Sequence, residues 1–242
     1  MLIRGLCHVL INVKEVKNLS NISEDYIEEY IRSLISTEND KILEIEKYAH
    51  YNHIPIIEKE VAQFLKVLLK IAKPKRILEI GTAIGYSAIV MASSTDDFCR
   101  ITTIERRSDM IELAKENLER TGYAERVNII CGEAEEILLK LKEKYDFIFL
   151  DASKGHYLKF FNRCVELLND RGIIMADNVL YKGMVASDEL VVRRKRTIVK
   201  RMREYLKHIH KLDGYESCVI PIGDGVSLTY REERDICINQ SY

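Results

Sequence analysis

The feature that most constrains this chain is the segment at residues 76–87, Arg-Ile-Leu-Glu-Ile-Gly-Thr-Ala-Ile-Gly-Tyr-Ser. A β-branched run ends there in an acidic residue and two glycines, at the point where a helix must begin. Glycine lets the backbone approach a ligand closely at a helix N-terminus. Gly81 and Gly85 stand four residues apart, without the Gly-x-Gly start of the dinucleotide motif, which counts against NAD and its pyrophosphate. The turn therefore predicts a nucleotide-type cofactor that lacks phosphate.

From this turn onward, strand-like and helix-like segments alternate. We expect strands at residues 76–80, 101–105, 127–131, 145–150 and 172–176, and helices at residues 85–93, 108–121, 133–141 and 155–168. Such alternation predicts βαβ crossovers and an α/β fold with a doubly wound, mostly parallel sheet. A long helix is expected over residues 188–210. An antiparallel hairpin of residues 217–222 and 226–231 then adds the last two of seven strands. Amphipathic helices precede the sheet, the third ending before Pro74.

The composition fits one domain. A chain of 242 residues that is 47% hydrophobic can bury one core. We assign residues 21–242 to this domain and residues 1–20 to an N-terminal extension to which the sequence assigns no role. The six cysteines are scattered without a Cys-x-x-Cys pair, which is typical of reduced, structural thiols. The apolar N-terminus lacks a cleavage pattern, and no run is long and uncharged enough to span a bilayer. We therefore expect a soluble cytoplasmic protein.

Two later strands end in residues that commonly bind metals. Asp151 follows the expected strand at 145–150, and Asp177 and Asn178 follow the one at 172–176. Because ligands bind beyond the carboxyl ends of the strands in a doubly wound sheet, these side chains are expected to converge. Three oxygen ligands suit a hard cation such as Mg²⁺ or Mn²⁺, with positions left for water or substrate. The alternative is that each Asp is an ordinary cap or turn residue.

Two further charged residues stand at site-like positions. Glu105 lies about 20 residues after the glycine turn, where a carboxylate in such folds accepts hydrogen bonds from ribose hydroxyls; the alternative is a solvated acid at a strand end. Lys154 follows Asp151 by three residues. A partly desolvated lysine beside a cation can have a lowered pKa and accept a proton. Its alternative is a solvated lysine at a helix start.

Together these motifs resemble a known family. The matching segments are Glu-x-Gly-x-x-x-Gly-Tyr-Ser at 79–87, Asp-x-x-Lys at 151–154, Ala-Asp-Asn at 176–178 and Pro-Ile-Gly-Asp-Gly at 221–225. They are similar to the metal-dependent O-methyltransferases that include the catechol and caffeoyl-CoA enzymes, and the resemblance covers residues 54–231. Within that family the chain resembles bacterial tRNA 5-hydroxyuridine methyltransferases in particular, through Ile-Pro-Ile at 54–56, the turn at 81–88 and Lys-Arg-Met-Arg at 200–203.

The resemblance implies S-adenosylmethionine as methyl donor and a homodimeric enzyme. It implies donor-binding roles for Ile57, Glu79, Gly81, Ser87, Glu105, Gly132, Glu133, Ala134 and Asp151. Glu79 and Gly81 would lie near the methionine part and Ser87 near its carboxylate, while residues 132–134 would lie beside adenine. The same resemblance makes Lys154 and Asp151 the catalytic pair beside the cation.

The chemistry explains why a cation would be useful here. A methyl group on sulfonium needs an oxyanion nucleophile in line, and a divalent cation lowers the pKa of a hydroxyl and fixes its position. A substrate with two adjacent oxygens can chelate the open sites. Catechol has such a pair, and so does 5-hydroxyuridine, through its O5 hydroxyl and O4 carbonyl.

A basic segment bears on the substrate. Its residues are Arg193, Arg194, Lys195, Arg196, Lys200, Arg201 and Arg203. In a chain of net charge -1, this clustering is typical of phosphate contacts, although a solvated helix face is the alternative. The main hypothesis is methylation of 5-hydroxyuridine at the wobble position of tRNA, giving 5-methoxyuridine. An O-methyltransferase for small catechols or acyl-CoA esters is the alternative. A noncatalytic donor-binding or RNA-binding module is a third possibility, which the lysine and metal motifs disfavour.

Overall fold

The computed structural model of the protein describes residues 22–36, 40–152 and 154–233. The expected N-terminal extension at residues 1–20 lies outside these ranges, as do Cys7 and Cys237. The four cysteines within them, at positions 99, 131, 164 and 218, are free thiols. In this part of the chain, no helix is long and apolar enough to cross a bilayer.

The chain forms one seven-stranded sheet in the order β3-β2-β1-β4-β5-β7-β6. The strands are β1 (Arg76–Ile80), β2 (Arg100–Glu105), β3 (Val127–Cys131), β4 (Tyr145–Leu150), β5 (Leu168–Ala176), β6 (Tyr215–Ile220) and β7 (Val226–Arg231). Strands β1 to β5 pair in parallel, whereas β7 is antiparallel to both β5 and β6. The prediction of a doubly wound, mostly parallel sheet closed by a C-terminal hairpin is confirmed.

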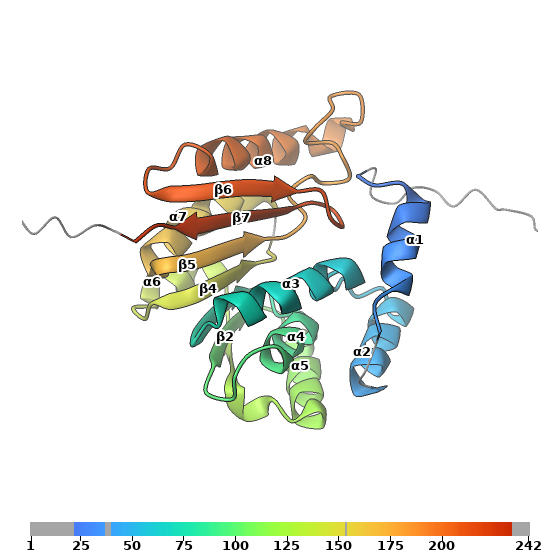
Figure 1. The fold of residues 1–242 in the computed structure, drawn as a ribbon, viewed down its shortest axis with the longest axis vertical. Helices are drawn as coiled ribbons and strands as arrows, with labels where there is room; N and C mark the ends of the chain where they lie inside the picture. The colour runs from blue at the N-terminus through green and yellow to red at the C-terminus, as the bar shows by residue number, and fades with distance from the viewer. Residues whose placement is uncertain (1–21, 37–39, 153, 234–242) are drawn as a thin grey trace, which may run out of the picture.

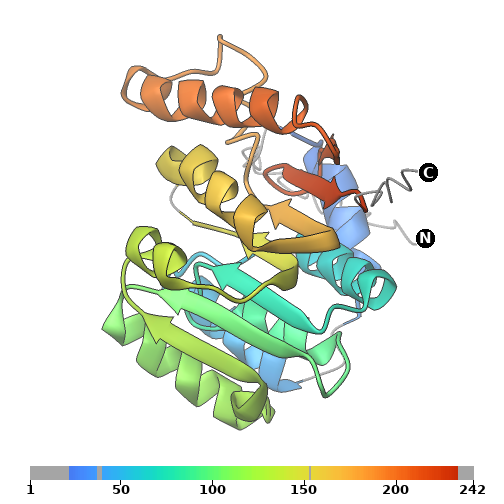
Figure 2. The ribbon, with the colours of Figure 1, turned by 90° about the vertical axis from the view of Figure 1, so that its left-hand side faces the viewer.

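Helices cover both faces of this sheet (Figures 1 and 2). They are α1 (Asp25–Ser33), α2 (Asp40–Tyr51), α3 (Lys59–Ala72), α4 (Tyr86–Ser93), α5 (Ser108–Thr121), α6 (Ala134–Lys140), α7 (Tyr157–Leu167) and α8 (Arg196–Ile209). One apolar core contains residues of α2 to α5 and the other contains residues of α6 to α8. The central strands are buried on both faces, which explains why apolar residues predominate in β1 and β4.

The strand order reverses between β1 and β4, and the ends of the strands there are joined by backbone hydrogen bonds. Gly81 N–H donates to the carbonyl of Ile104, and Asp151 N–H donates to that of Ile80, both at 3.0 Å. Gly132 N–H and Asp177 N–H make the equivalent bonds to residues 105 and 150, at 2.8 and 3.1 Å. The residues that follow β1, β3, β4 and β5 therefore share one edge of the sheet, where ligands bind in such folds.

The predicted helix at residues 188–210 is wrong in its first part. Helix α8 begins at Arg196, after a short 3-10 turn η3 (Arg193–Lys195). The side chain of Arg203 explains the difference, because it donates to the carbonyls of Val185 (2.9 Å) and Met184 (3.2 Å) and pairs with Asp188 at 2.6 Å. The segment before α8 thus folds back along the helix instead of extending it.

Two smaller boundaries also differ from prediction. Strand β5 begins at Leu168, four residues earlier than expected, and a register irregularity where it pairs with β4 accommodates the extra length. Helix α7 begins at Tyr157 and not at residue 155, because a 3-10 turn η2 (Lys154–His156) comes first.

Candidate active site

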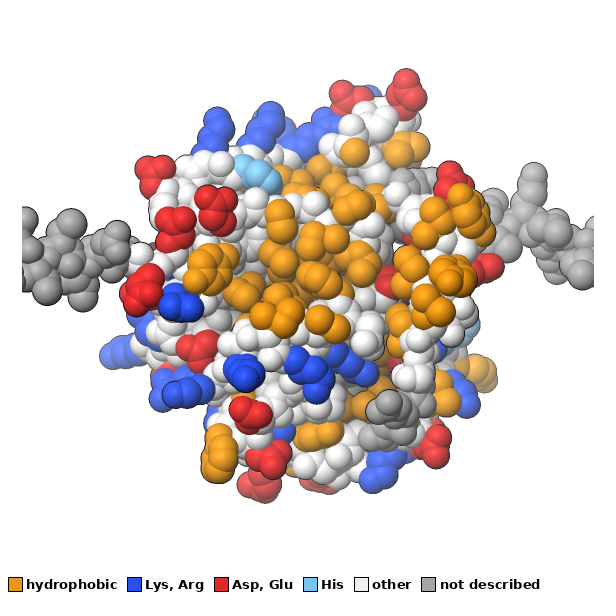
Figure 3. Space-filling view, viewed as in Figure 1, with side chains coloured by type: hydrophobic (Ala, Val, Ile, Leu, Met, Phe, Trp, Pro, Cys, Tyr) orange, Lys and Arg blue, Asp and Glu red, His pale blue; other side chains and the backbone are white. Residues whose placement is uncertain are grey.

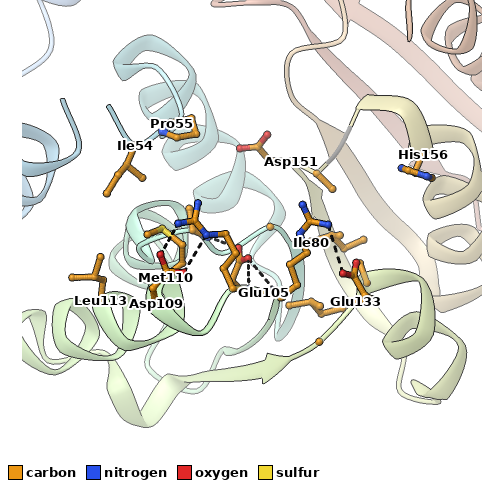
Figure 4. Close-up of a pocket in the computed structure, with 18 of the residues that line it drawn as sticks. Ile54, Pro55, Ile80, Glu105, Asp109, Met110, Leu113, Glu133, Asp151 and His156 are labelled. Carbon is orange, nitrogen blue, oxygen red and sulfur yellow. Dashed lines mark hydrogen bonds and ion pairs between the residues drawn. The ribbon is translucent and has the colours of Figure 1, made fainter. Parts of the chain in front are cut away.

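A cleft of about 870 Å³ opens at this edge of the sheet (Figure 4). Among the predicted site residues, those that line it are Gly81, Glu105, Gly132, Glu133, Ala134 and Asp151. They come from the ends of four strands and the start of α6, so the fold brings distant parts of the sequence together. Ile57, Glu79, Ser87, Asp177 and Asn178 do not line the cleft. Of these, Ile57, Glu79, Ser87 and Asp177 are buried.

The turn after β1 requires glycine. Gly81 has a φ of +106°, a conformation that side chains other than glycine rarely adopt. A Cβ atom on Gly81 would also collide with the backbone carbonyl oxygen of Asp151. The turn after β1 and the turn after β4 are therefore in direct backbone contact, with both residues facing the cleft.

Glu105 is held by backbone amides at the floor of the cleft. Its Oε2 accepts a hydrogen bond from Ala83 N–H at 3.0 Å, and its Oε1 accepts from Arg106 and Arg107 N–H at 2.9 and 3.0 Å. Three donors fix the carboxylate in one orientation. Carboxylate oxygens have further lone pairs, so the group can still accept hydrogen bonds from a ligand.

Glu79 is a fully buried acid beside the cleft. Thr103 Oγ1 donates to its Oε2 at 2.5 Å, whereas Oε1 has no hydrogen-bond partner within the described part of the chain. Burial raises the pKa of Glu79 to about 7; the hydroxyls of Ser87 and Thr103 oppose this rise and the charges of Asp151 and Glu105 add to it. An unpartnered buried carboxylate oxygen suits a cationic donor such as an ammonium group.

The predicted metal ligands stand on adjacent strand ends. Asp151 and Asp177 directly follow Leu150 and Ala176, which are paired in the sheet, and Asp177 is 1% exposed. Asn178 has a φ of +54°, and its N–H donates to Asp177 Oδ1 at 2.7 Å. The described residues contain no group of three or more His, Cys, Asp or Glu suited to a metal. The set here is two carboxylates and one amide, which are oxygen ligands for a hard cation.

Lys154 lies on the turn η2, three residues after Asp151. Its side chain lies outside the described part of the chain, so its role stays a prediction. The turn itself is anchored from α8, because Arg201 Nη1 donates to the carbonyl of Gly155 at 3.1 Å. His156, at the end of the turn, lines the cleft and lies 5.8 Å from Phe160 between ring centroids.

The predicted basic segment divides into two groups. Arg193, Arg194, Arg196, Lys200 and Arg201 are exposed. Arg203 is instead engaged with the segment before α8, and Lys195 Nζ lies 5.6 Å from the centre of the Tyr181 ring, in the loop that follows Asn178. Arg201 and Lys195 therefore contact the two segments that follow Asp151 and Asn178.

Sequence reasoning missed several residues that line the cleft. Arg106, Asp109 and Met110 follow the end of β2, and Arg106 forms an ion pair with Glu133 at 3.6 Å (Figure 4). Ile54 and Pro55 line it from the segment before α3. The signal available in the sequence was position, since Arg106 and Arg107 directly follow the strand-end acid Glu105.

Comparisons with known proteins agree with this geometry. A family described as O-methyltransferase matches residues 33–232. The chain belongs to the O-methyltransferase family. It is 30% identical to a caffeoyl-CoA O-methyltransferase of Eucalyptus gunnii, over 92% of this chain and 94% of that protein.

Two solved structures support the assignment to this O-methyltransferase family. A putative caffeoyl-CoA O-methyltransferase from Staphylococcus aureus is 36% identical, with a TM-score of 0.80 over 86% of this chain and 100% of its own. The methyltransferase PaMTH1 of Podospora anserina, solved with SAH bound, is 25% identical, with a TM-score of 0.79 over 86% and 95%. The prediction of an enzyme of the S-adenosylmethionine-dependent O-methyltransferase family is confirmed.

Proposed function

We propose that this O-methyltransferase uses S-adenosylmethionine and a divalent cation to methylate a hydroxyl that has a second oxygen beside it. The observation that carries the proposal is the shared edge of the sheet. One cleft there is lined by Glu105, which suits a nucleoside, and by Asp151. Asp151 directly follows β4, and the neighbouring strand β5 ends directly before Asp177. Donor and substrate would then meet within a few ångströms.

The donor end is supported by three features. Glu105 is preoriented by backbone amides, and Gly132 has a φ of +144° at the other side of the cleft. Glu79 offers an unpartnered oxygen in a buried setting. We assign ribose to Glu105, the amino group of the donor to Glu79, its carboxylate to Ser87, and adenine to residues 132–134, with Ile57 packing behind.

The reaction end uses the other residues. A divalent cation held by Asp151, Asp177 and Asn178 would lower the pKa of a substrate hydroxyl. Lys154 would then take the hydroxyl proton, and the oxygen would attack the methyl carbon of the donor. The carbon–sulfur bond breaks with its electron pair moving to sulfur, so the products are the methyl ether and S-adenosylhomocysteine.

The first prediction concerns donor affinity and pH. Glu79, with a pKa of about 7, is neutral below that pH and charged above it, and only the carboxylate attracts the ammonium of the donor. Titration calorimetry with S-adenosylhomocysteine should give a Kd that is constant above pH 7 and rises about tenfold per pH unit below it. Glu79→Gln should bind more weakly and lose this pH dependence. An equal slope in the variant would contradict the role of Glu79.

The second prediction concerns the cation. Asp177→Asn keeps the size of the side chain and removes its charge, so Mg²⁺-dependent turnover should fall at least about 100-fold. Binding of S-adenosylhomocysteine, measured by calorimetry, should change little. Asp97→Asn is the control, because Asp97 is 98% exposed and lies outside the cleft. Normal turnover by Asp177→Asn, or full turnover in the presence of a chelator, would remove the cation from the proposal.

For the substrate, we propose a small hydroxylated molecule of the catechol or acyl-CoA ester type. This choice is supported by the curated relatives, which are named caffeoyl-CoA O-methyltransferases and match over most of their length. The exposed arginines and lysines of η3 and α8 suit the phosphates of coenzyme A. The same basic segment also favours a second candidate, 5-hydroxyuridine in tRNA, because Arg201 and Lys195 contact the segments that follow Asp151 and Asn178.

The third prediction separates these substrates. Labelled donor is supplied with catechol, caffeoyl-CoA or hydroxyuridine-containing tRNA, at salt concentrations from about 50 to about 200 mM. A neutral catechol should react at a rate that hardly depends on salt, and tRNA methylation should weaken steeply with it. The double variant Arg194→Gln, Lys200→Gln should leave catechol turnover within about twofold and raise the KM for caffeoyl-CoA. Methoxyuridine in the tRNA, with no product from either small molecule, would reverse the order of the two candidates.

We also propose that the enzyme is a homodimer. The sheet face formed by β5, β7 and β6 has no helix in front of it in Figure 1, and Figure 3 shows apolar side chains gathered there. The strand register aligns Leu228 and Cys218 on this face beside the buried Met175, with Ile173, Tyr230 and Glu216 in the next row. Helix α1 adds exposed apolar residues, among them Tyr26, Tyr30 and Leu34. Contiguous exposed apolar patches often mark protein–protein interaction sites.

The fourth prediction tests this surface. Light scattering after gel filtration should give twice the mass of the chain for the wild type. Cys218→Arg, which places a charge on an exposed position of the open face, should shift the mass toward that of one chain. Phe98→Arg is the matched control, since Phe98 is 89% exposed on a loop outside the sheet, and its mass should not change. A wild type that is monomeric at micromolar concentration would refute the dimer.

A further inference from the structure

A buried tyrosine joins the two strand ends that carry the proposed cation ligands. Tyr157, the first residue of α7, is 1% exposed. Its hydroxyl donates a hydrogen bond to the backbone carbonyl of Asp177 at 2.8 Å. The same oxygen lies 3.5 Å from the carbonyl oxygen of Leu150, the residue before Asp151. One phenol group thus sits between the ends of β4 and β5.

The ring of Tyr157 is fixed by neighbouring aromatic side chains. Tyr205 of α8 meets it edge-on, with ring centroids 5.6 Å apart and an interplanar angle of 79°. Phe161 in turn packs edge-on against Tyr205 at 5.5 Å. The Tyr205 hydroxyl is bonded to Ser227 Oγ on β7 at 2.9 Å, away from the Asp177 carbonyl. Because these buried rings interlock, the Tyr157 hydroxyl has one position available to it.

The hydroxyl stays protonated at this position. Burial raises the pKa of Tyr157 well above its ordinary value, and the charges of Asp151 and Asp177 raise it further. A phenol in this state donates a hydrogen bond and does not exchange its proton with the reaction. Its contribution must therefore come through the backbone that it holds.

That backbone is unusual enough to need an anchor. Asn178, Tyr181 and Lys182 all have φ between +47° and +55°, a region that costs energy for residues other than glycine. Such a loop keeps its shape only when its surroundings fix it. The Tyr157 hydroxyl and the Asp177 N–H bond to Leu150 are two contacts that tie the start of this loop to β4.

We propose that Tyr157 is a positioning residue for the cation site, holding the Asp177 loop against the end of β4 so that Asp151 and Asp177 bind one ion. The inference rests on the proposed cation-dependent function. Without the hydroxyl, the Asp177 carbonyl loses this hydrogen bond and the loop can shift relative to Asp151. Groups that orient metal ligands typically change metal affinity by about 10- to 100-fold when they are removed.

The test compares two variants that each lose one buried hydroxyl and keep the ring. Mn²⁺ binding to the full chain is measured by electron paramagnetic resonance of the free ion, in the presence of S-adenosylhomocysteine. Tyr157→Phe should raise the Kd for Mn²⁺ roughly 10-fold or more. Tyr205→Phe, whose hydroxyl bonds to Ser227, should keep the wild-type Kd. Thermal melts of both variants report any shared loss of stability.

A second readout is the cation dependence of turnover. Tyr157→Phe should need roughly 10-fold more Mg²⁺ to reach half its maximal rate, while its rate at saturating Mg²⁺ approaches that of the wild type. Its Kd for S-adenosylhomocysteine should not change. A purely structural role would instead lower the rate at every Mg²⁺ concentration, in step with the loss of stability.

The outcomes separate the inference from the function on which it rests. If the wild type binds Mn²⁺ and Tyr157→Phe binds it equally well, the positioning role is refuted and the cation-dependent reaction stands. If Tyr205→Phe weakens Mn²⁺ binding as much as Tyr157→Phe does, general packing explains the effect and the inference is again refuted. If the wild type itself binds no Mn²⁺, the proposed function loses its cation and the inference is overturned with it.

Discussion

Backbone hydrogen bonds between the ends of parallel strands are the constraint on which the rest of this structure depends. The N–H of the residue after one strand donates to a carbonyl at the end of its neighbour: the last carbonyl for Gly132, Asp151 and Asp177, and the one before it for Gly81. Each bond fixes where the chain turns away from the sheet. The positions of the side chains at these turns are therefore determined mainly by the register of the strands, and less by the loops that follow. A site built this way tolerates variation in its loops as long as the register holds.

The same constraint explains which residue types the turns need. The Gly81 turn and the Asp151 turn are so close that a single Cβ atom would meet a backbone carbonyl. Asp177 has a different structural role. Its carboxylate accepts a hydrogen bond from Asn178 N–H and so supports a residue with left-handed backbone directly after the strand. The second carboxylate oxygen is a further acceptor. A structural and a ligand-binding role can thus belong to one side chain, which is why the turn-former alternative for such an Asp and the metal-ligand hypothesis do not exclude each other.

The sequence predicts the parts of the fold that local patterns encode. Strands with apolar runs and helices with a regular apolar face were placed within a few residues, because burial on one or two faces determines both pattern and structure. The prediction of a helix over residues 188–210 is wrong in its first part because the segment before α8 is held by long-range hydrogen bonds from Arg203, which no local pattern reveals. In the sequence, Arg203 also looks like one more exposed charge of the basic segment. The full burial of Glu79 and the contact of Tyr157 with Asp177 likewise depend on packing between elements far apart in the chain.

Charge makes the two ends of the cleft depend on each other. Glu79 lies beside the cleft that Glu105 and Asp151 line, and the charges of the last two already raise the pKa of the first. A cation at Asp151 and Asp177 would cancel part of that repulsion and lower the pKa of Glu79, so the acid would be charged over a wider pH range. The gain for the proposed donor contact at Glu79 would be confined to pH values near and below 7, because Glu79 is charged above that pH without the ion. The sulfonium of the donor would carry positive charge into the same region, which limits how far the gain extends. Clustered carboxylates can therefore remain close together in this site, because the ligands proposed for it are cationic.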